Sequence, residues 1–184
     1  MVMRPLPTDK RLWSPSLIPG PIMLVSTVDD EGRPNVAPKS WVQMVAFDPP
    51  TLMFAGSNGQ PTEDNALRTG CFALNVVDET LLPSVLRCLQ WRGEERIERS
   101  GWSLVDASRI RAPVLDGAPA HLECELRGSR EIGSGLVVFG EIVAATVDER
   151  ILEAEEGERY QRLAQALFLE DGVYSIVQRM RRAD

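Results

Sequence analysis

The chain of 184 residues is 43% hydrophobic, which is enough for one complete core, whereas two independent domains would each be small. Its formal net charge of −7 argues against a nucleic-acid-binding protein, because contacts to phosphates need a concentrated basic surface. We therefore expect a single domain over residues 1–184 that does not act on nucleic acid.

The cysteines and the apolar segments indicate the compartment. Cys71, Cys88 and Cys124 are an odd number without a Cys-x-x-Cys pair, so the sequence predicts neither a disulfide framework nor a zinc ribbon. The first ten residues lack the apolar run of a signal peptide, and no stretch reaches the roughly 18 apolar residues of a membrane span. We expect a cytoplasmic protein without a membrane segment, whose proline-containing residues 1–16 form an extended N-terminal arm.

The first predicted elements form a β-hairpin. Residues 22–28 are rich in β-branched side chains and predict a strand, and residues 29–33 form a polar turn that contains glycine. The chain then returns through residues 35–40, whose small side chains and proline leave backbone N–H and C=O groups uncovered. Such a segment suits a flat ligand that lies against the main chain.

Two more strands and a helix follow the hairpin. Residues 41–47 and 51–55 are apolar, and the Asp-Pro-Pro sequence at 48–50 predicts a turn between them. After the glycine-containing turn at 56–59, Thr62 is the predicted N-cap of a helix. A turn that leads into a helix N-terminus favours anion binding, because free N–H groups and the helix dipole point to the same place.

The second half of the chain supplies further strands and helices, which the apolar patterns locate. They are a strand over 71–77, a helix over 81–89, a charged loop or short helix over 90–100, strands over 120–126 and 136–147, and a helix from the acidic run at 153–159 to Leu167. We expect the strands 120–126 and 136–147 to pair with each other.

Few side chains in the sequence are candidates for acid–base or metal chemistry. His121 is the only histidine, which excludes a multi-histidine metal site, and Ser40 has no partner histidine in its motif, so no catalytic triad is predicted. Trp91 is a lone aromatic in a charged segment, and such a residue more often packs against the protein. We therefore assign no catalytic residue and no metal ligand.

Several short motifs occur together in one order. They are Pro19-Gly20-Pro21, Val25-Ser26-Thr27, Asn35-Val36-Ala37-Pro38-Lys39-Ser40, Pro49-Pro50, Thr62-Glu63-Asp64-Asn65 and Thr69-Gly70-Cys71-Phe72. Each motif is weak alone, but the combination over about fifty residues is specific, and in order and spacing the chain resembles the flavin reductase-like family. The resemblance implies a mainly β fold, a β-barrel with peripheral helices known as the FMN-binding split barrel.

The resemblance also implies a site and a function. Around the flavin it places Asn35, Ala37, Pro38, Lys39, Ser40 and Trp41, whose backbone lines the ring, and Ser57, Thr62 and Asn65, which surround the phosphate or ribityl chain. The implied function is an oxidoreductase that binds FMN, with FAD as the alternative, and transfers hydride or electrons from NADH or NADPH to flavin or another acceptor. A homodimer and a flavin-dependent monooxygenase partner are also implied. The segment over residues 90–100 is implied to lie near the open face of the flavin, which makes Trp91, Trp102 and Arg96 candidates for contact with a substrate. The alternative is a non-catalytic flavin- or haem-binding module on the same barrel.

The chain departs from the family pattern near the expected phosphate site. Gln60-Pro61 stands where the family commonly has Lys-Asp, so a positive charge is missing there. Lys39 or one of the arginines, such as Arg68, is then expected to supply the charge. Without such a replacement, we expect the protein to release FMN more readily than relatives that keep the lysine.

Overall fold

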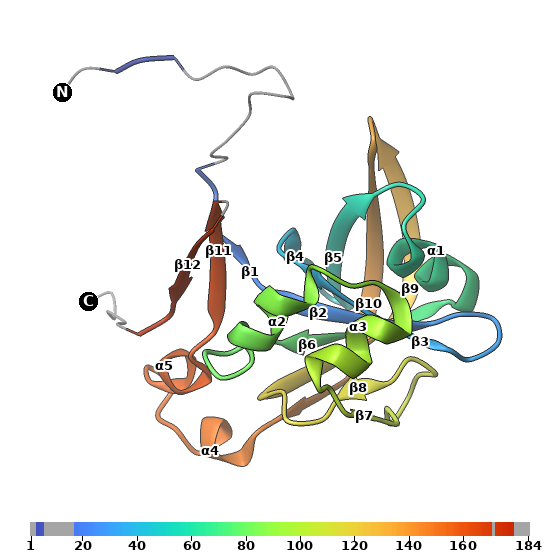
Figure 1. Ribbon diagram of the computed structural model, residues 1–184. Helices are drawn as coiled ribbons and strands as arrows, with labels where there is room; N and C mark the ends of the chain where they lie inside the picture. Colours follow the sequence, from blue (N-terminus) through green and yellow to red (C-terminus); the bar gives the residue numbers. More distant parts are fainter. Residues whose placement is uncertain (1–2, 6–16, 171, 179–184) are drawn as a thin grey trace.

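The computed structural model describes residues 3–5, 17–170 and 172–178, so most of the expected arm over residues 1–16 lies outside the described part. A seven-stranded antiparallel sheet forms the centre of the fold (Figure 1). In spatial order its strands are β3 (Pro34–Lys39), β2 (Met23–Val28), β6 (Cys71–Val76), β9 (Ala120–Ile132), β10 (Gly135–Val147), β5 (Pro50–Ser57) and β4 (Val42–Phe47). The strands predicted in these regions are confirmed, and β9 pairs with β10 as expected.

Shorter elements surround this sheet. The helices are α1 (Pro61–Thr69), α2 (Leu82–Cys88), α3 (Gly93–Ser100), α4 (Glu149–Leu152) and α5 (Arg159–Leu163). A second, three-stranded sheet contains β1 (Gly20–Pro21), β11 (Ala166–Glu170) and β12 (Val173–Ile176), and β7 (Leu104–Val105) pairs with β8 (Val114–Leu115). None of the helices in the described residues is long and apolar enough to cross a membrane.

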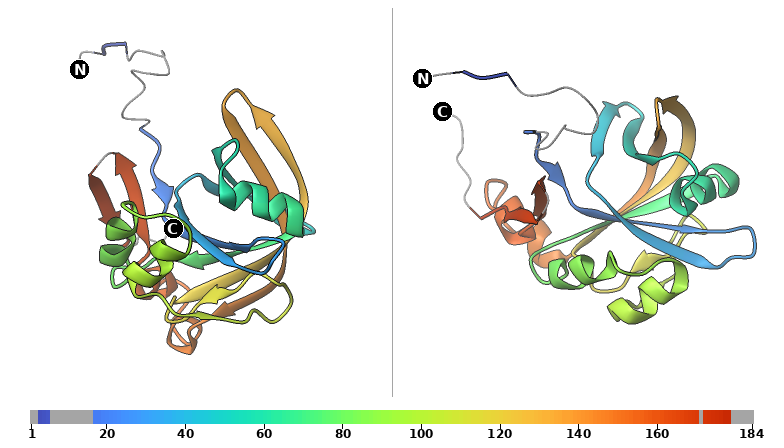
Figure 2. Two further views of the ribbon diagram at one scale, coloured as in Figure 1. Left: turned by 45° about the vertical axis from the view of Figure 1, so that its right-hand side comes forward. Right: turned by 45° about the horizontal axis from the view of Figure 1, so that its top comes forward.

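The large sheet coils into an open barrel. β3 and β4 lie at its opposite edges, although only residues 40–41 join them in the chain. The sheet curls around its core, as the two views in Figure 2 show, and β3 comes near β5 without entering its ladder. The mainly β barrel with peripheral helices that the sequence predicts is therefore confirmed, and β3 keeps one unpaired backbone edge.

Two apolar cores pack on the two faces of the sheet, because neighbouring side chains of a strand point to opposite faces. On β2, Val25 packs inside the barrel, while Leu24 packs on the outer face. Inside the barrel the rings of Phe54 and Phe72 meet edge to face with their centroids 4.8 Å apart. Outside, α2, α3 and the residues up to Leu115 cover β2 and β6, and this brings α3 beside the edge strand β3 (Figure 1).

One predicted helix is wrong. The segment from the acidic run at 153–159 to Leu167 is not one helix, because α5 covers only Arg159–Leu163 and Leu167 belongs to β11. The helix ends where Ala164 adopts a left-handed conformation, with φ of 46°. Leu167 then pairs with Pro21 of β1, so pairing with the start of the chain overrides the local helical pattern.

Candidate functional site

The candidate site is a cleft beside the unpaired edge of β3, here called the β3 cleft. Its volume is about 250 Å³, and β3, the start of α1 and the residues around the start of α3 form its walls. Five of the nine residues predicted for the site line this cleft, namely Asn35, Ala37, Pro38, Lys39 and Thr62. Gln60, at the start of α1, and Leu89, Arg92 and Arg96 line the cleft as well.

Arg96 connects α3 to the backbone of the edge strand. Its Nη1 donates a hydrogen bond of 2.9 Å to the carbonyl oxygen of Val36, and its Nε donates to the carbonyl oxygens of Trp91 at 2.9 Å and Cys88 at 3.3 Å. Burial lowers the pKa of Arg96, and the nearby positive charge of Arg92 lowers it further. Arg96 therefore fixes the wall of the cleft while its own charge stays half-buried.

A buried polar network fixes α1 against the β2–β3 hairpin. Nδ2 of Asn35 donates to the hydroxyl of Thr62 at 2.9 Å and to that of Thr27 at 3.4 Å. Nδ2 of Asn65 reaches the same Thr27 hydroxyl, also at 3.4 Å. All four side chains belong to buried residues, so the network holds the first turns of α1 in place beside the cleft.

The predicted N-cap at Thr62 is wrong. The helix begins at Pro61, its N-cap is Gln60, and no side chain caps its N-terminus. Proline suits the first helical position because its missing N–H would have no partner there. Thr62 is instead inside the first turn, where its hydroxyl accepts the bond from Asn35. The N–H groups at the start of α1 therefore remain available to an anion.

Lys39 forms a buried ion pair with Glu63 of α1. Nζ of Lys39 lies 2.5 Å from Oε1 of Glu63, whose side chain is fully buried, and 13% of the Lys39 side chain is exposed. Gly56 makes room for this pair, because a Cβ at that position would overlap with the Glu63 carboxylate and with the Lys39 ammonium group. The second carboxylate oxygen of Glu63, Oε2, is buried without a hydrogen-bond partner. The positive charge of Lys39 is thus already balanced within the protein.

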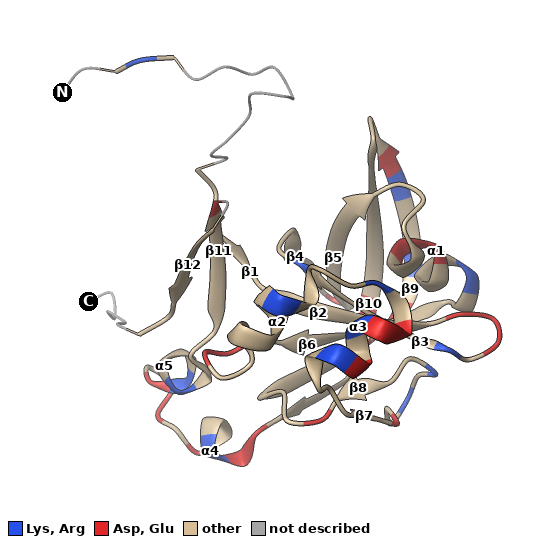
Figure 3. Cartoon of the chain, in the orientation of Figure 1, with Lys and Arg blue, Asp and Glu red and all other residues tan. Residues whose placement is uncertain are grey.

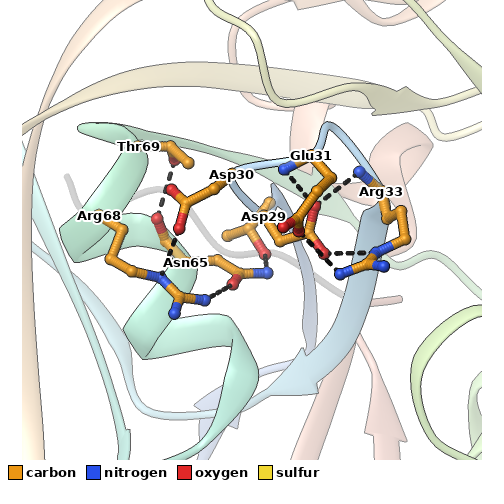
Figure 4. Close-up of polar contacts among 8 residues, drawn as sticks. Asp29, Asp30, Glu31, Arg33, Asn65, Arg68 and Thr69 are labelled. Carbon is orange, nitrogen blue, oxygen red and sulfur yellow. Dashed lines mark hydrogen bonds and ion pairs between the residues drawn. The ribbon is translucent and has the colours of Figure 1, made fainter.

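Arg68 lies in a second cavity, on the other side of the start of α1. This cavity has a volume of about 490 Å³ and shares Asn35, Pro61 and Gly93 with the β3 cleft. Figure 4 shows that the Arg68 side chain interacts with both Asn65 and Asp30. Its Nη2 donates to Oδ1 of Asn65 at 2.9 Å, and its Nε lies 3.6 Å from the Asp30 carboxylate. Arg68 therefore does not line the β3 cleft.

The structure distributes the other predicted site residues over different surfaces. Asn65 lines the second cavity with Arg68. Ser40 lines an apolar pocket of about 170 Å³ and also, with the exposed Trp41, a pocket on the far side of the 40–41 connection. Ser57 is exposed at the end of β5 and lines none of these cavities. The sequence motifs therefore suggested a position for Ser57 beside the ligand, whereas in the structure it lies outside the β3 cleft.

The apolar pocket continues the β3 cleft. The two share Pro38, Lys39 and Leu89, and the far wall of the pocket carries Phe168 and Tyr174. These two rings meet edge to face with centroids 5.9 Å apart on the β11–β12 hairpin. The combined space thus runs along β3 from the start of α1 to an aromatic wall.

The aromatic and histidine candidates have packing roles in the structure. Trp102 is 8% exposed and its Nε1 donates to the hydroxyl of Ser84 at 2.9 Å. The Trp91 ring faces the guanidinium of Arg99 at 5.7 Å. His121 is half-buried in β9, and its Nδ1 lies 3.0 Å from Oδ1 of the buried Asn75, while burial lowers its pKa.

Leu89, Arg92 and Gly93 line the cleft although sequence reasoning did not assign them, whereas Gln60-Pro61 was placed at the expected phosphate site. Figure 3 shows basic and acidic residues close together on α3, so charge pattern alone does not single out the arginine that faces the cleft. The available signal is the position of Arg92 immediately before Gly93, where a helix begins. Arg96, named above as a possible substrate contact, does line the cleft.

Comparisons with known proteins agree with this architecture. A protein of Aquifex aeolicus that has no assigned function is 29% identical over 157 residues, which cover 79% of this chain and 78% of that protein. The 2-nitrobenzoate 2-nitroreductase NbaA of Pseudomonas fluorescens has a similar structure, with a TM-score of 0.83 and 27% identity over 97% of this chain and 92% of the other. Nitrilotriacetate monooxygenase component B of Bacillus cereus has a TM-score of 0.87 at 22% identity, covering 100% and 98% of the two chains, and this shows a common fold.

The family model described as the flavin reductase like domain matches residues 16–175, which is most of the chain. This match includes every strand of the large sheet and all the residues that line the β3 cleft. The protein therefore belongs to the flavin reductase-like domain family.

Proposed function

We propose that this protein is an FMN-binding oxidoreductase of the flavin reductase type, which takes electrons from NADH or NADPH and passes them to flavin or another acceptor. The observation that carries the proposal is the shape and chemistry of the β3 cleft. It runs along an unpaired strand edge from an uncapped helix N-terminus to an apolar pocket with an aromatic wall. FMN has the matching parts, with an anionic phosphate at one end and a flat ring at the other.

The residues of the cleft fit this cofactor. The backbone of Ala37 and Pro38 offers a flat surface for a ring, and the N–H groups at the start of α1 face the anionic end. When bound, FMN supplies the hydride and electron chemistry itself, so the protein needs to bind and orient it and to exclude competing reactions. This agrees with a cleft without a recognisable acid–base pair, in which Lys39 is held in an ion pair by Glu63.

The apolar pocket supports a place for a second flat molecule. It lies next to the β3 cleft at Pro38 and Leu89, and Phe168 and Tyr174 give it an aromatic wall on which a planar ring stacks well. We propose that the nicotinamide donor and a planar acceptor use this pocket in turn. The similarity to a 2-nitrobenzoate 2-nitroreductase supports an aromatic acceptor as well as free flavin.

We also propose a homodimer and an oxygenase partner. Exposed apolar residues on β4 support the dimer, and the name of the Bacillus cereus protein with the same fold, a monooxygenase component, supports the partner. The proposal keeps FAD as the alternative flavin and a cytoplasmic location, as expected from the sequence.

One spectroscopic experiment tests the proposal. The purified protein is mixed with FMN, separated from free flavin, and its absorption is recorded before and after anaerobic addition of NADH or NADPH. We expect the bands of oxidised flavin at first and their loss on reduction. Flavin bands that persist with both nucleotides would indicate the non-catalytic flavin module instead. A haem Soret band would indicate the haem-binding module, although the only histidine, His121, is bonded to Asn75.

A further inference from the structure

The question that the missing lysine raises is which positive charge meets an anion in the β3 cleft. The two residues expected to supply it, Lys39 and Arg68, are both engaged elsewhere. Lys39 is neutralised by the buried carboxylate of Glu63 at 2.5 Å. Arg68 faces the second cavity, where Asn65 and Asp30 hold it (Figure 4). Neither therefore offers an uncompensated charge to the cleft.

Two other arginines line the cleft and have only neutral oxygen partners. Arg92 is exposed, and its Nη1 lies 3.5 Å from Oε1 of Gln60, the residue at the start of α1. Arg96 donates only to backbone carbonyl oxygens. Among the ion pairs formed by the described residues, none includes Arg92 or Arg96. The two guanidinium groups thus face one cavity without a carboxylate to balance them.

The charges of Arg92 and Arg96 make this part of the β3 cleft favourable for an anion. Burial is the main cause of the lowered pKa of Arg96, and the like charge of Arg92 lowers it further, as expected for two cations that line one cleft. An anion between them would remove this repulsion and gain charge-assisted hydrogen bonds, which are stronger than neutral ones. The start of α1, which no side chain caps, borders the same space. Its N–H groups carry a partial positive charge and also favour an anion there.

We propose that Arg92 and Arg96 bind the phosphate of the flavin mononucleotide, and that this pair replaces the family lysine for which Gln60 stands. The inference rests on the proposed function, because it assigns the residues that select a phosphorylated flavin in the same cleft. Arg92 is exposed, so its guanidinium group can move to contact the phosphate. Arg96 supplies a charge whose position is fixed by its hydrogen bond to the carbonyl oxygen of Val36. The ligand class is a phosphomonoester joined to an isoalloxazine ring, so riboflavin, which has no phosphate, is the natural comparison.

The test is a titration of the full chain with FMN and with riboflavin, followed by flavin fluorescence. Wild type is expected to bind FMN at least tenfold more tightly than riboflavin, and FMN affinity should fall with added salt while riboflavin affinity does not. Arg92→Gln should weaken FMN binding by about tenfold to a hundredfold, the effect of one charge-assisted hydrogen bond, and leave riboflavin binding unchanged. Arg99→Gln is the matched control, because Arg99 lies on α3, which begins directly after Arg92, but pairs with Glu95 and does not line the cleft.

A second variant tests the same charge without removing an arginine. Gln60→Glu places a carboxylate beside Arg92, so it should weaken FMN binding selectively, whereas the same change at an exposed glutamine such as Gln161 should not. Equal affinity of wild type for FMN and riboflavin would overturn the phosphate assignment and leave the proposed flavin binding intact. A selective loss of FMN binding in Arg68→Gln, with none in Arg92→Gln, would overturn it as well. Failure to bind either flavin would overturn both proposals.

Discussion

The ammonium group of Lys39 on β3 lies 2.5 Å from Oε1 of Glu63 on α1, and the two residues are separated by 24 positions in the chain. The pair joins the edge strand of the sheet to the helix that borders the cleft. It therefore has a structural role, and it neutralises the charge of a lysine that lines the cleft and that sequence reasoning assigned to the ligand.

Breaking this ion pair from one side should destabilise the fold. Glu63→Ala leaves the ammonium group of Lys39 largely buried without a counter-charge, and the expected loss in the free energy of unfolding is about 3–5 kcal/mol. The double variant Lys39→Met, Glu63→Leu should recover most of this loss, because no buried charge remains. Urea unfolding of the single and double variants measures both values. A loss of less than about 1 kcal/mol for Glu63→Ala would mean that the pair behaves like an exposed one.

Gly56→Ala should destabilise the protein through the same pair. The added methyl group would overlap with the carboxylate of Glu63, which cannot move away because it is fully buried. We expect a cost of about 1–3 kcal/mol in the free energy of unfolding, as for other overpacked sites. Gly157→Ala is the control, since a Cβ there meets nothing within 4 Å and its φ is not left-handed. Similar unfolding curves for the two variants would contradict the proposed contact.

The Thr62 hydroxyl should matter for the buried network and not for helix capping. Thr62→Val keeps the shape but leaves Nδ2 of Asn35 without its 2.9 Å partner, at an expected cost of about 1–3 kcal/mol. Thr62→Ser keeps the hydroxyl and should lose much less stability. Thermal and urea unfolding distinguish the two variants. An equal loss in both would show that the methyl group of Thr62, not its hydroxyl, stabilises this region.

Titration of His121 should lower stability in mild acid. Burial lowers the pKa of His121 in the folded protein below its ordinary value of 6.5, so the unfolded chain takes up this proton first as the pH falls. The stability that neutral His121 contributes is therefore fully present above about pH 7, and it is lost as the pH falls through 6.5 toward the lowered pKa of the folded state. Unfolding free energies at pH 7.5 and at about pH 5.5, above the range where most carboxylates titrate, should show this fall. His121→Gln should reduce the slope, and an unchanged slope would assign it to other groups.

The outer face of β4 should carry the contact between two copies of the chain. Val45 and Phe47 on this edge strand are 49% and 87% exposed, and the neighbouring Trp41 is 65% exposed. An edge strand with large exposed apolar residues favours pairing with another chain. We expect a dimer by light scattering at micromolar concentration and a monomer for Phe47→Glu. Leu152→Glu, which changes an exposed apolar residue of α4, should remain dimeric, and a wild-type monomer would contradict the homodimer.

The local pattern of apolar residues was sufficient to predict most strands of the large sheet. The alternating and continuous apolar runs located β2, β6 and β10 within a few residues, because strands buried on one or both faces must carry such patterns. Of β9 they located only the first half, because the strand continues to Ile132 beyond the predicted end at 126. The same reasoning failed at Leu167, where the local signal was helical and the strand exists through its pairing with β1. The N-cap predicted at Thr62 was wrong for a related reason. The hydroxyl of Thr62 accepts a hydrogen bond from Asn35, 27 positions earlier in the chain, and does not cap the helix.

The sequence by itself determined the family, the mainly β class and the segment around β3 that forms one wall of the cleft, because these depend on motifs that are contiguous in the chain. Only the tertiary structure decided which charges face that cleft. Lys39 meets Glu63 across 24 positions, and Arg96 reaches Val36 across 60, and no local spacing encodes either contact. Charges are balanced by whichever groups folding brings within a few ångströms, so the pairing of Lys39 and the freedom of Arg92 emerge only when α1, α3 and the edge of β3 come together.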